Sequence, residues 1–253
     1  MTVYFIGAGP GAADLITVRG QGLLARCQVC LYPGSLTPTE LLAHCPDDAL
    51  LVDTADRTLD QIIDEMVAAH GRGHDVARLC SGDPSIYSAV AEQMRRLDAA
   101  GVPYEVVPGV PAFAAAAAVL GRELTVPTVG QSVVLTRTQA RSTSMPDGES
   151  LATFGASGAT LALHLAANRI EQVVDELLPH YGAECPAAAV AHASQPGEQV
   201  VRGTLGTIAG QVRDAGINRA AMIFVGRVLA AENFPDSFLY SAGRDRSKQP
   251  ASL

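Results

Sequence analysis

Short apolar runs alternate with stretches of helical periodicity through the first half of the chain. Leu59, Ile62, Ile63, Met66 and Val67 follow the i, i+3, i+4, i+7 spacing of an amphipathic helix. The predicted strands of this half are 2–6, 29–32, 50–52, 76–80 and 104–107, and the predicted helices are 15–26, 59–67, 85–100 and 112–120. This strand–helix succession indicates an α/β fold whose first sheet is mostly parallel, with helices on its faces.

A second set of elements follows an irregular segment, 121–130, which contains Pro127 and Gly130. We place a domain boundary there, giving an N-terminal α/β domain, 1–122, and a C-terminal α/β domain, 123–253. The predicted strands are 132–136, 160–164, 187–191, 199–204 and 221–225, and the predicted helices include 170–178 and 208–215. Pro196-Gly197 is typical of a hairpin, so the second sheet is predicted to be mixed. The tail, 241–253, is polar and has no apolar period.

Composition and charge narrow the functional classes. The chain has 253 residues, of which 48% are hydrophobic and 17% charged, so a packed core is expected rather than disorder. Its formal charge of −8 and lack of a basic stretch disfavour nucleic-acid binding. No Lys or Arg precedes Arg19, and the longest apolar run, 110–120, is far short of the roughly 20 residues that cross a bilayer. We therefore expect a cytoplasmic protein that binds no membrane.

Two candidate metal or redox patterns are weak. Cys27 and Cys30 form a C-x-x-C pair, but no second pair of ligands exists, and five cysteines in a chain of this size fit a reducing compartment. His70 and His74 are four residues apart, but the glycines between them disfavour the helix that would align them. We expect packing for the cysteines, a solvated loop for the histidines, and no metal site.

A glycine-rich turn follows the first predicted strand and reads Gly7-Ala8-Gly9-Pro10-Gly11-Ala12. It satisfies the loose G-x-G-x-x-[G/A] pattern of dinucleotide sites, which also need an acidic residue about 20 residues further on. The second strand instead ends in Leu31-Tyr32-Pro33-Gly34, and Pro10 removes a backbone donor from the turn. This motif leaves two interpretations open: the turn binds the cofactor of a dinucleotide dehydrogenase, or it is purely structural.

Two further loops follow predicted strands. One reads Ser81-Gly82-Asp83-Pro84-Ser85-Ile86-Tyr87, in which Asp83 and Pro84 suit the cap and first turn of the helix predicted at 85–100. The other reads Pro108-Gly109-Val110-Pro111-Ala112. Both lie at the carboxyl ends of strands, where open α/β sheets form their ligand crevice.

These motifs, in this order and followed by Met222-Ile223-Phe224-Val225-Gly226, resemble the tetrapyrrole methylase family over nearly the whole chain. The family methylates ring carbons of uroporphyrinogen and corrin precursors with S-adenosylmethionine. Segments 31–36, 81–87, 123–127 and 133–137 resemble the branch that acts on carbon 11 of precorrin-4. The uroporphyrinogen enzymes carry an Asp where this chain has Gly34 and Ser35, so their proposed general base is not carried over and no catalytic residue is assigned.

The resemblance implies two α/β domains with S-adenosylmethionine in the cleft between them, S-adenosylhomocysteine as product, a small tetrapyrrole substrate and a homodimer. The family's cofactor contacts fall on Pro10, Ser81, Gly82, Asp83, Ile86, Pro111, Ala112, Leu165 and Ala193. Pro111 stands where Ser or Thr is usual, and Leu165 where Met is frequent. Asp83 has two interpretations, a cofactor contact or a helix cap.

The substrate carries many carboxylates, and Arg binds carboxylates better than Lys does. The candidate arginines in or near predicted loops are Arg57, Arg78, Arg122, Arg137 and Arg141, none of which is assigned a contact. Three other functions stay open: a sister methylase acting on another ring carbon, an enzyme for cobalt-precorrin-4, and a non-catalytic protein that binds a tetrapyrrole or the cofactor.

Overall fold

The computed structural model describes residues 1–34, 37–138, 144–240 and 243–244, which form two compact units. The first unit comprises residues 1–119 together with 192–199, and the second comprises 120–191 and the residues from 200 onward. The chain thus leaves the first unit after residue 119, and the predicted boundary between 122 and 123 stays a prediction. The predicted tail, 241–253, lies outside the described residues except for 243–244.

The first unit is built on a five-stranded sheet of order β3-β2-β4-β1-β5. Its strands are β1 (Val3–Gly7), β2 (Val29–Tyr32), β3 (Leu50–Asp53), β4 (Val76–Cys80) and β5 (Tyr104–Val107). Every pair in this sheet is parallel, as predicted, and Gly7 lies opposite Cys80 at the carboxyl ends of β1 and β4. The helices are α1 (Val18–Leu24), α2 (Thr39–Leu42), α3 (Leu59–Gly71), α4 (Val90–Ala100) and α5 (Ala112–Leu120), with a 3-10 turn at Ala13–Leu15.

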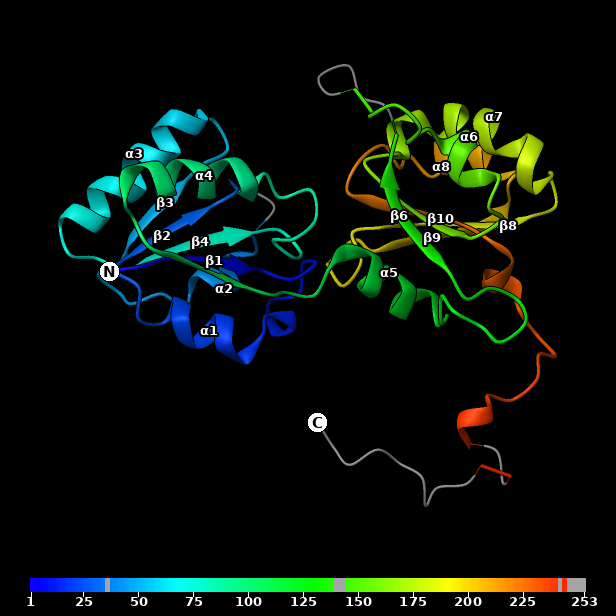
Figure 1. Ribbon diagram of the computed structural model, residues 1–253, viewed down its shortest axis with the longest axis horizontal. Helices are drawn as coiled ribbons and strands as arrows, with labels where there is room; N and C mark the ends of the chain where they lie inside the picture. Colours follow the sequence, from blue (N-terminus) through cyan, green and yellow to red (C-terminus); the bar gives the residue numbers. More distant parts are fainter. Residues whose placement is uncertain (35–36, 139–143, 241–242, 245–253) are drawn as a thin grey trace. The chain divides into compact units, whose positions relative to one another are not determined.

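Alternate residues of the strands form two cores on opposite faces of this sheet. Val3 and Phe5 of β1 pack with residues of α3 and α4, whereas Tyr4 and Ile6 pack with residues of α1 and α2. Figure 1 shows α3 and α4 on one face and α1 and α2 on the other. The central strands β1, β2 and β4 are therefore buried on both faces, which is typical of parallel sheets and explains their nearly continuous apolar sequences. The edge strands β3 and β5 are largely exposed.

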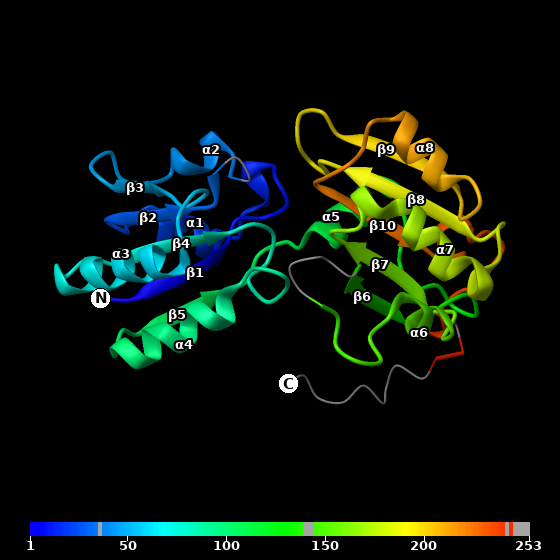
Figure 2. The same ribbon diagram turned by 90° about the horizontal axis from the view of Figure 1, so that it is seen from above.

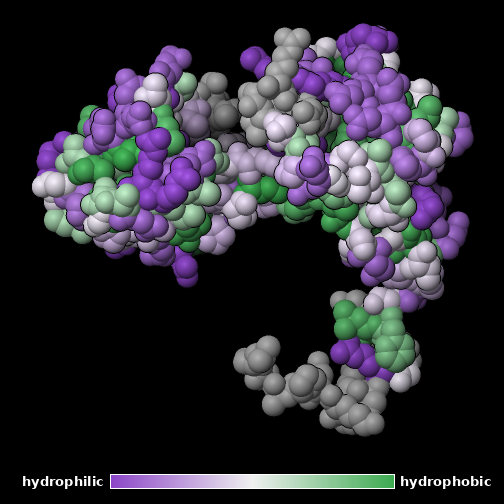
Figure 3. All heavy atoms as spheres, turned by 45° about the horizontal axis from the view of Figure 1, so that its top comes forward, coloured by the Kyte–Doolittle hydropathy of each residue, from purple (hydrophilic) through white to green (hydrophobic). Residues whose placement is uncertain are grey.

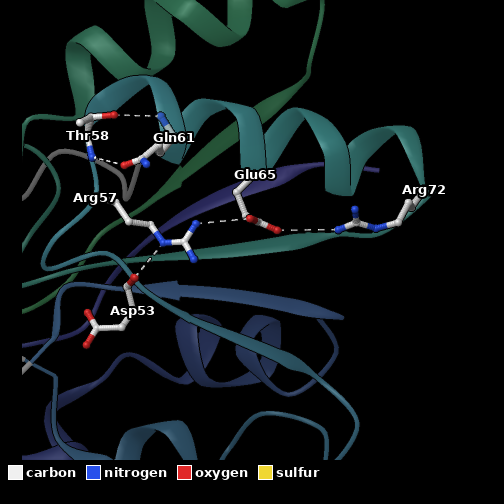
Figure 4. Close-up of polar contacts among 6 residues, drawn as sticks. All are labelled: Asp53, Arg57, Thr58, Gln61, Glu65 and Arg72. Carbon is white, nitrogen blue, oxygen red and sulfur yellow. Dashed lines mark hydrogen bonds and ion pairs between the residues drawn. The ribbon is translucent and has the colours of Figure 1, made fainter.

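Helix α3 begins at a capping box. The backbone N–H of Gln61 donates to the hydroxyl of Thr58 at 3.3 Å, and the backbone N–H of Thr58 donates to the side-chain oxygen of Gln61 at 2.9 Å (Figure 4). The same view shows Arg57 donating to the carbonyl of Asp53 at 3.1 Å and pairing with Glu65 at 3.5 Å. These contacts tie the end of β3 to α3.

The prediction of a helix over 85–100 was wrong at its start. Helix α4 begins at Val90, and the residue before it, Ala89, has left-handed backbone angles. Asp83 and Pro84 therefore do not cap this helix. They belong to an irregular loop between β4 and α4. The carboxylate of Asp83 instead accepts hydrogen bonds from the backbone N–H groups of Ser85 and Gly109.

The second unit contains a sheet of order β6-β7-β10-β8-β9. Its strands are β6 (Val133–Arg137), β7 (Thr160–His164), β8 (Pro186–Ala191), β9 (Gln199–Thr204) and β10 (Ala221–Val225). Since β6 and β7 are parallel and β10 is antiparallel to β7 and β8, the prediction of a mixed sheet is confirmed. The helices are α6 (Leu151–Gly155), α7 (Ile170–Tyr181) and α8 (Ile208–Asp214), with 3-10 turns at Ala167–Arg169, Arg227–Ala230 and Phe238–Tyr240.

One apolar core lies between this second sheet and its helices. It includes Leu161 and Leu163 of β7, Ile223 of β10, and residues of α7 and α8. Figures 1 and 2 show α6, α7 and α8 on the same face of the sheet. Strand β8 is rich in alanine, and its Ala187, Ala189 and Ala191 belong to this core, so the helices can pack closely on it.

Apolar side chains are exposed near the end of the second unit. Phe234 and Leu239 are about half-exposed and Phe238 is 71% exposed, and Figure 3 shows the apolar group in this part of the chain. Among the helices that the structure describes, none is long and apolar enough to span a membrane.

Candidate functional site

The first sheet has a topological switch point between β1 and β4. These strands are neighbours, but the chain leaves β1 toward β2 and leaves β4 toward β5, on opposite sides of the pair. Open α/β sheets bind ligands outside the carboxyl ends of strands at such a point. The two loops that begin here are the predicted glycine-rich turn, 7–12, and the predicted loop 81–87.

Four glycines lie where the loops at this point come into backbone contact. Gly9 and Gly82 exchange hydrogen bonds, with the Gly9 N–H donating at 3.2 Å and the Gly82 N–H donating at 2.8 Å. A Cβ atom on Gly7 would lie 2.5 Å from the Cα of Gly109 and 2.8 Å from the carbonyl oxygen of Gly82. No other residue fits at Gly7, because a side chain there would collide with rigid backbone. We refer to Gly7, Gly82 and Gly109 as the glycine junction.

Asp83 joins two of these loops through its carboxylate. One oxygen accepts hydrogen bonds from the backbone N–H of Ser85 at 2.8 Å and from the Ser85 hydroxyl, and the other accepts from the backbone N–H of Gly109 at 2.8 Å. Burial raises the pKa of Asp83, but these hydrogen bonds outweigh it and hold the pKa below its ordinary value. The carboxylate is ionised at neutral pH. Of its roughly four acceptor positions, these bonds occupy three, so Oδ2 can accept one more.

Pro111 and Ala112 lie against the glycine junction. A Cβ atom on Gly82 would be 3.6 Å from the backbone nitrogen of Ala112 and 3.7 Å from the Cα of Pro111. Pro111 directly precedes α5, and its carbonyl accepts from the N–H groups of Ala114 and Ala115 at 3.1 and 3.3 Å. The structure therefore brings Gly82, Pro111 and Ala112 together, as the resemblance implies.

The segment 192–199 closes the other side of the glycine-rich turn and carries Ala193, which is buried. The hydroxyl of Ser194 accepts from the backbone N–H of Ala12 at 3.1 Å, and the amide nitrogen of Gln195 donates to the carbonyl of Pro10 at 2.8 Å. Sequence reasoning named Pro10 and Ala193 but missed Ser194 and Gln195. The polar pair before the Pro196-Gly197 turn was the available signal, but nothing in the sequence indicates its partner.

The other three predicted cofactor residues lie in different surroundings. Ser81 directly follows β4 and is exposed. Ile86 is half-buried in the loop between β4 and α4, and its N–H donates to the carbonyl of Asp83 at 3.4 Å. Leu165 belongs to the second unit, follows β7 and is 68% exposed. Its φ of 53° is left-handed, and its carbonyl accepts from the Thr138 hydroxyl at 3.3 Å. All the predicted cofactor residues except Leu165 thus lie in the first unit.

The candidate arginines differ in their burial and in their hydrogen-bond partners within the protein. Arg78 is an interior residue of β4 and is buried, so the prediction that it lies in or near a loop was wrong. Arg57 is held by Asp53 and Glu65, and Arg122 donates to the carbonyl of Ala231 at 3.3 Å. Arg137 donates to two backbone carbonyls, and Arg141 lies outside the described residues.

Cys27 and Cys30 are completely buried in the core under α1, as expected for packing residues. Burial, followed by the charge of Asp75, raises the pKa of Cys27 to about 12, so its thiol is protonated at neutral pH. Within the described residues, no group of three or more His, Cys, Asp or Glu side chains could hold a metal ion.

The chain is similar to proteins of a known family. A model of the Tetrapyrrole (Corrin/Porphyrin) Methylases matches residues 2–209. The chain belongs to the tetrapyrrole methylase family. This membership, and a strand order that places β4 between β2 and β1, argue against the dinucleotide dehydrogenase, whose order is 3-2-1-4-5.

Individual family members are similar over almost the full chain. The precorrin-4 C(11)-methyltransferase of Rhodococcus erythropolis is 64% identical over 98% of this chain and 99% of its own length. The solved structure of a cobalamin biosynthetic enzyme, cobalt precorrin-4 methyltransferase, has a TM-score of 0.88 at 38% identity and covers 90% of this chain and 95% of its own. Uroporphyrin-III C-methyltransferase from Thermus thermophilus, crystallised with S-adenosylhomocysteine, has a TM-score of 0.74 at 28% identity, covering 90% and 93%.

Proposed function

We propose that this tetrapyrrole methylase transfers a methyl group from S-adenosylmethionine to carbon 11 of precorrin-4, giving precorrin-5, in cobalamin biosynthesis. The 64% identity to the Rhodococcus precorrin-4 C(11)-methyltransferase, over nearly all of both chains, carries the proposal. The lower identity of 38% to a cobalt precorrin-4 methyltransferase favours the metal-free substrate.

The proposed cofactor contacts are Pro10, Ser81, Gly82, Asp83, Ile86, Pro111, Ala112, Leu165 and Ala193. The residues of the first unit fit a nucleoside ligand, because they gather in loops at the switch point of a parallel sheet, where open α/β sheets bind ligands. The family member crystallised with S-adenosylhomocysteine supports the same cofactor class. Asp83 is proposed to bind a hydroxyl or amine of the cofactor through the free acceptor position of Oδ2, since its other positions are occupied.

S-adenosylmethionine supplies a methyl group that is already activated on a sulfonium. The protein then needs chiefly to hold the ring carbon in line with that methyl and to exclude water, which is worth roughly 7 to 11 kcal/mol when the geometry is right. The rigid backbone contacts of Gly7, Gly82 and Gly109 suit this task, because they leave the loops little freedom to move. No side chain is assigned as nucleophile or general base.

The proposal includes a homodimer in the cytoplasm. The acidic composition and the five cysteines, all free thiols in the structure, support a reducing compartment. The homodimer rests on the resemblance to the family. Sedimentation of the purified protein, with a mass near 53 kDa expected for a dimer of 26.3 kDa chains (2 × 26.3 = 52.6), tests it.

Product analysis tests the reaction. The purified protein is incubated with precorrin-4, generated in situ, and with S-adenosylmethionine labelled with carbon-13 in its methyl, and the product is examined by mass spectrometry and NMR. One labelled methyl on carbon 11 is expected. A methyl on another carbon would make the protein a sister methylase, and methylation of only the cobalt-loaded substrate would assign it to the cobalt route. Tight binding of both ligands without transfer would indicate a non-catalytic carrier.

A further inference from the structure

A buried chain of hydrogen bonds connects the centre of β4 to the end of the loop that carries the proposed cofactor contacts. The guanidinium Nε of Arg78 donates to the side-chain oxygen of Gln93 at 3.2 Å, and the amide nitrogen of Gln93 donates to the carbonyl of Ala89 at 2.8 Å. Arg78 is 8% exposed and Gln93 is 3% exposed. A guanidinium only donates and a carbonyl only accepts, so a flipped Gln93 amide would break both bonds.

Arg78 is a buried cation whose hydrogen-bond partners are neutral. Besides Gln93, its guanidinium donates to the Thr54 hydroxyl at 3.1 Å and to the carbonyl of Leu79 at 3.4 Å. Among the residues that the structure describes, no carboxylate pairs with it. Burying a charge without a counter-charge lowers stability, so packing alone does not explain an arginine at this position.

The loop held by this chain has an unfavourable backbone conformation. Tyr87 and Ala89 both have a φ of 52°, in the left-handed region that residues other than glycine seldom adopt. The Ser88 hydroxyl donates to the carbonyls of Asp83 and Ile86 at 2.9 and 3.1 Å, which holds the middle of the loop. At the end of the loop, the bond from Gln93 fixes the carbonyl of Ala89.

We infer that Arg78 and Gln93 are positioning residues for cofactor binding: Arg78 orients the Gln93 amide, and Gln93 holds the strained end of the loop 83–89. Neither side chain needs to touch the cofactor. The identity of the ligand rests on the proposed function, whereas the hold on the loop rests only on the contacts described.

Gln93→Glu separates positioning from stability. The carboxylate still accepts from Arg78 and gives that cation a buried counter-charge, but it cannot donate to the carbonyl of Ala89 and repels it. The melting temperature is expected to stay the same or rise. The affinity for S-adenosylhomocysteine, measured by calorimetry, is expected to fall about tenfold, because a buried donor is replaced by an unpaired acceptor. In the methyl-transfer reaction, KM for S-adenosylmethionine is expected to rise by a larger factor than kcat falls.

Hydrogen–deuterium exchange of the amides at 85–89, without any ligand, tests the loop directly. Exchange is expected to be faster in Gln93→Glu than in the unchanged protein. Arg78→Lys should do the same, because a lysine lacks the planar fork that reaches both Gln93 and Thr54. Gln61→Glu is the matched control, because it makes the same chemical change on α3. Its side-chain oxygen accepts from the Thr58 N–H, and a carboxylate oxygen can still accept that bond. Neither the exchange rate at 85–89 nor the affinity for S-adenosylhomocysteine should change.

The outcomes are distinguishable. Unchanged exchange and unchanged affinity in Gln93→Glu would overturn the inference, as would an affinity loss matched by a general loss of thermal stability. If the unchanged protein fails to bind S-adenosylhomocysteine, the proposed cofactor is wrong, and the exchange measurement alone then decides whether Gln93 holds the loop.

Discussion

The two sheets of this protein differ in the directions of their strands. In the first unit all strands are parallel, so their carboxyl ends lie at one edge, where Gly7, Gly82 and Gly109 meet. In the second unit β10 runs antiparallel to both its neighbours, so its carboxyl end lies at the edge opposite to those of β7 and β8. A parallel sheet with a switch point gathers many loops at one place, whereas a mixed sheet distributes them.

The second unit nevertheless has a smaller version of the same arrangement. Its strands β6 and β7 are parallel neighbours, and the residues that follow them, Thr138 and Leu165, are hydrogen-bonded to each other. Leu165 is the predicted cofactor residue of this unit. The comparison shows rigid backbone contacts between the loops of the first unit, whereas the corresponding loop of the second unit carries an exposed apolar side chain.

Gly7→Ala should have the largest effect, because the new Cβ would collide with the backbone of Gly109. We expect a loss of at least about 3 kcal/mol in unfolding free energy and no measurable binding of S-adenosylhomocysteine. Urea unfolding and calorimetry measure these quantities. Gly22→Ala, on an exposed and open face of α1, should instead stabilise the protein by up to about 1 kcal/mol. Equal effects of the two replacements would show that the glycine junction is not rigid.

Asp83→Asn should come next. Its amide group would place donors opposite the N–H of Ser85 or Gly109, and we expect affinity for S-adenosylhomocysteine to fall at least about tenfold. The pKa of Asp83 is lowered in the folded state, so its contribution to stability is present above the ordinary value of 3.8 and is lost as pH falls through the folded pKa. Asp83→Asn should therefore have a lower unfolding free energy than the protein without the substitution at pH 7, and this difference should disappear at acidic pH.

Asp98→Asn is the control for that variant. Among the described residues, the Asp98 carboxylate accepts one hydrogen bond, from the Tyr104 hydroxyl, which an Asn oxygen can also accept. It should leave the affinity unchanged. If Asp83→Asn binds as tightly as this control does, Asp83 is structural only.

A pH effect of intermediate size is expected from the second unit. Burial lowers the pKa of His164 to about 4 from 6.5. The unfolded chain therefore binds a proton below pH 6.5 that the folded chain rejects, and stability should fall between pH 6.5 and 4. His164→Gln should flatten this part of the profile, measured by urea unfolding at several pH values, whereas His180→Gln controls for removal of an exposed imidazole. A profile unchanged by His164→Gln would contradict the burial of this side chain.

Leu165→Ala should have the smallest effect on stability, below about 0.5 kcal/mol, because the side chain is mostly exposed. Affinity for S-adenosylhomocysteine should fall about fivefold, the effect of losing part of one buried leucine. Leu178→Ala, a partly exposed leucine of α7, should not change it. Equal affinities of the two variants would remove Leu165 from the proposed site.

Much of the fold was predictable because local patterns decide it. Strands 29–32, 76–80, 104–107, 160–164, 199–204 and 221–225 match the structure to the residue. All but 199–204 are short, mostly apolar runs between turn residues. The loops 7–12, 81–87 and 108–112 were also identified, because glycine and proline at strand ends are visible in the sequence.

The sequence by itself determined the two α/β halves, the loops at the strand ends and, through the order of its motifs, the family. Only the tertiary structure decided that α4 starts at Val90, that Asp83 binds Gly109 instead of capping a helix, and that 192–199 packs on the glycine-rich turn. The physical reason is distance along the chain. Periodicity and turn residues act over a few positions, whereas these features depend on hydrogen bonds between residues up to 185 positions apart, which exist only once the sheet has formed.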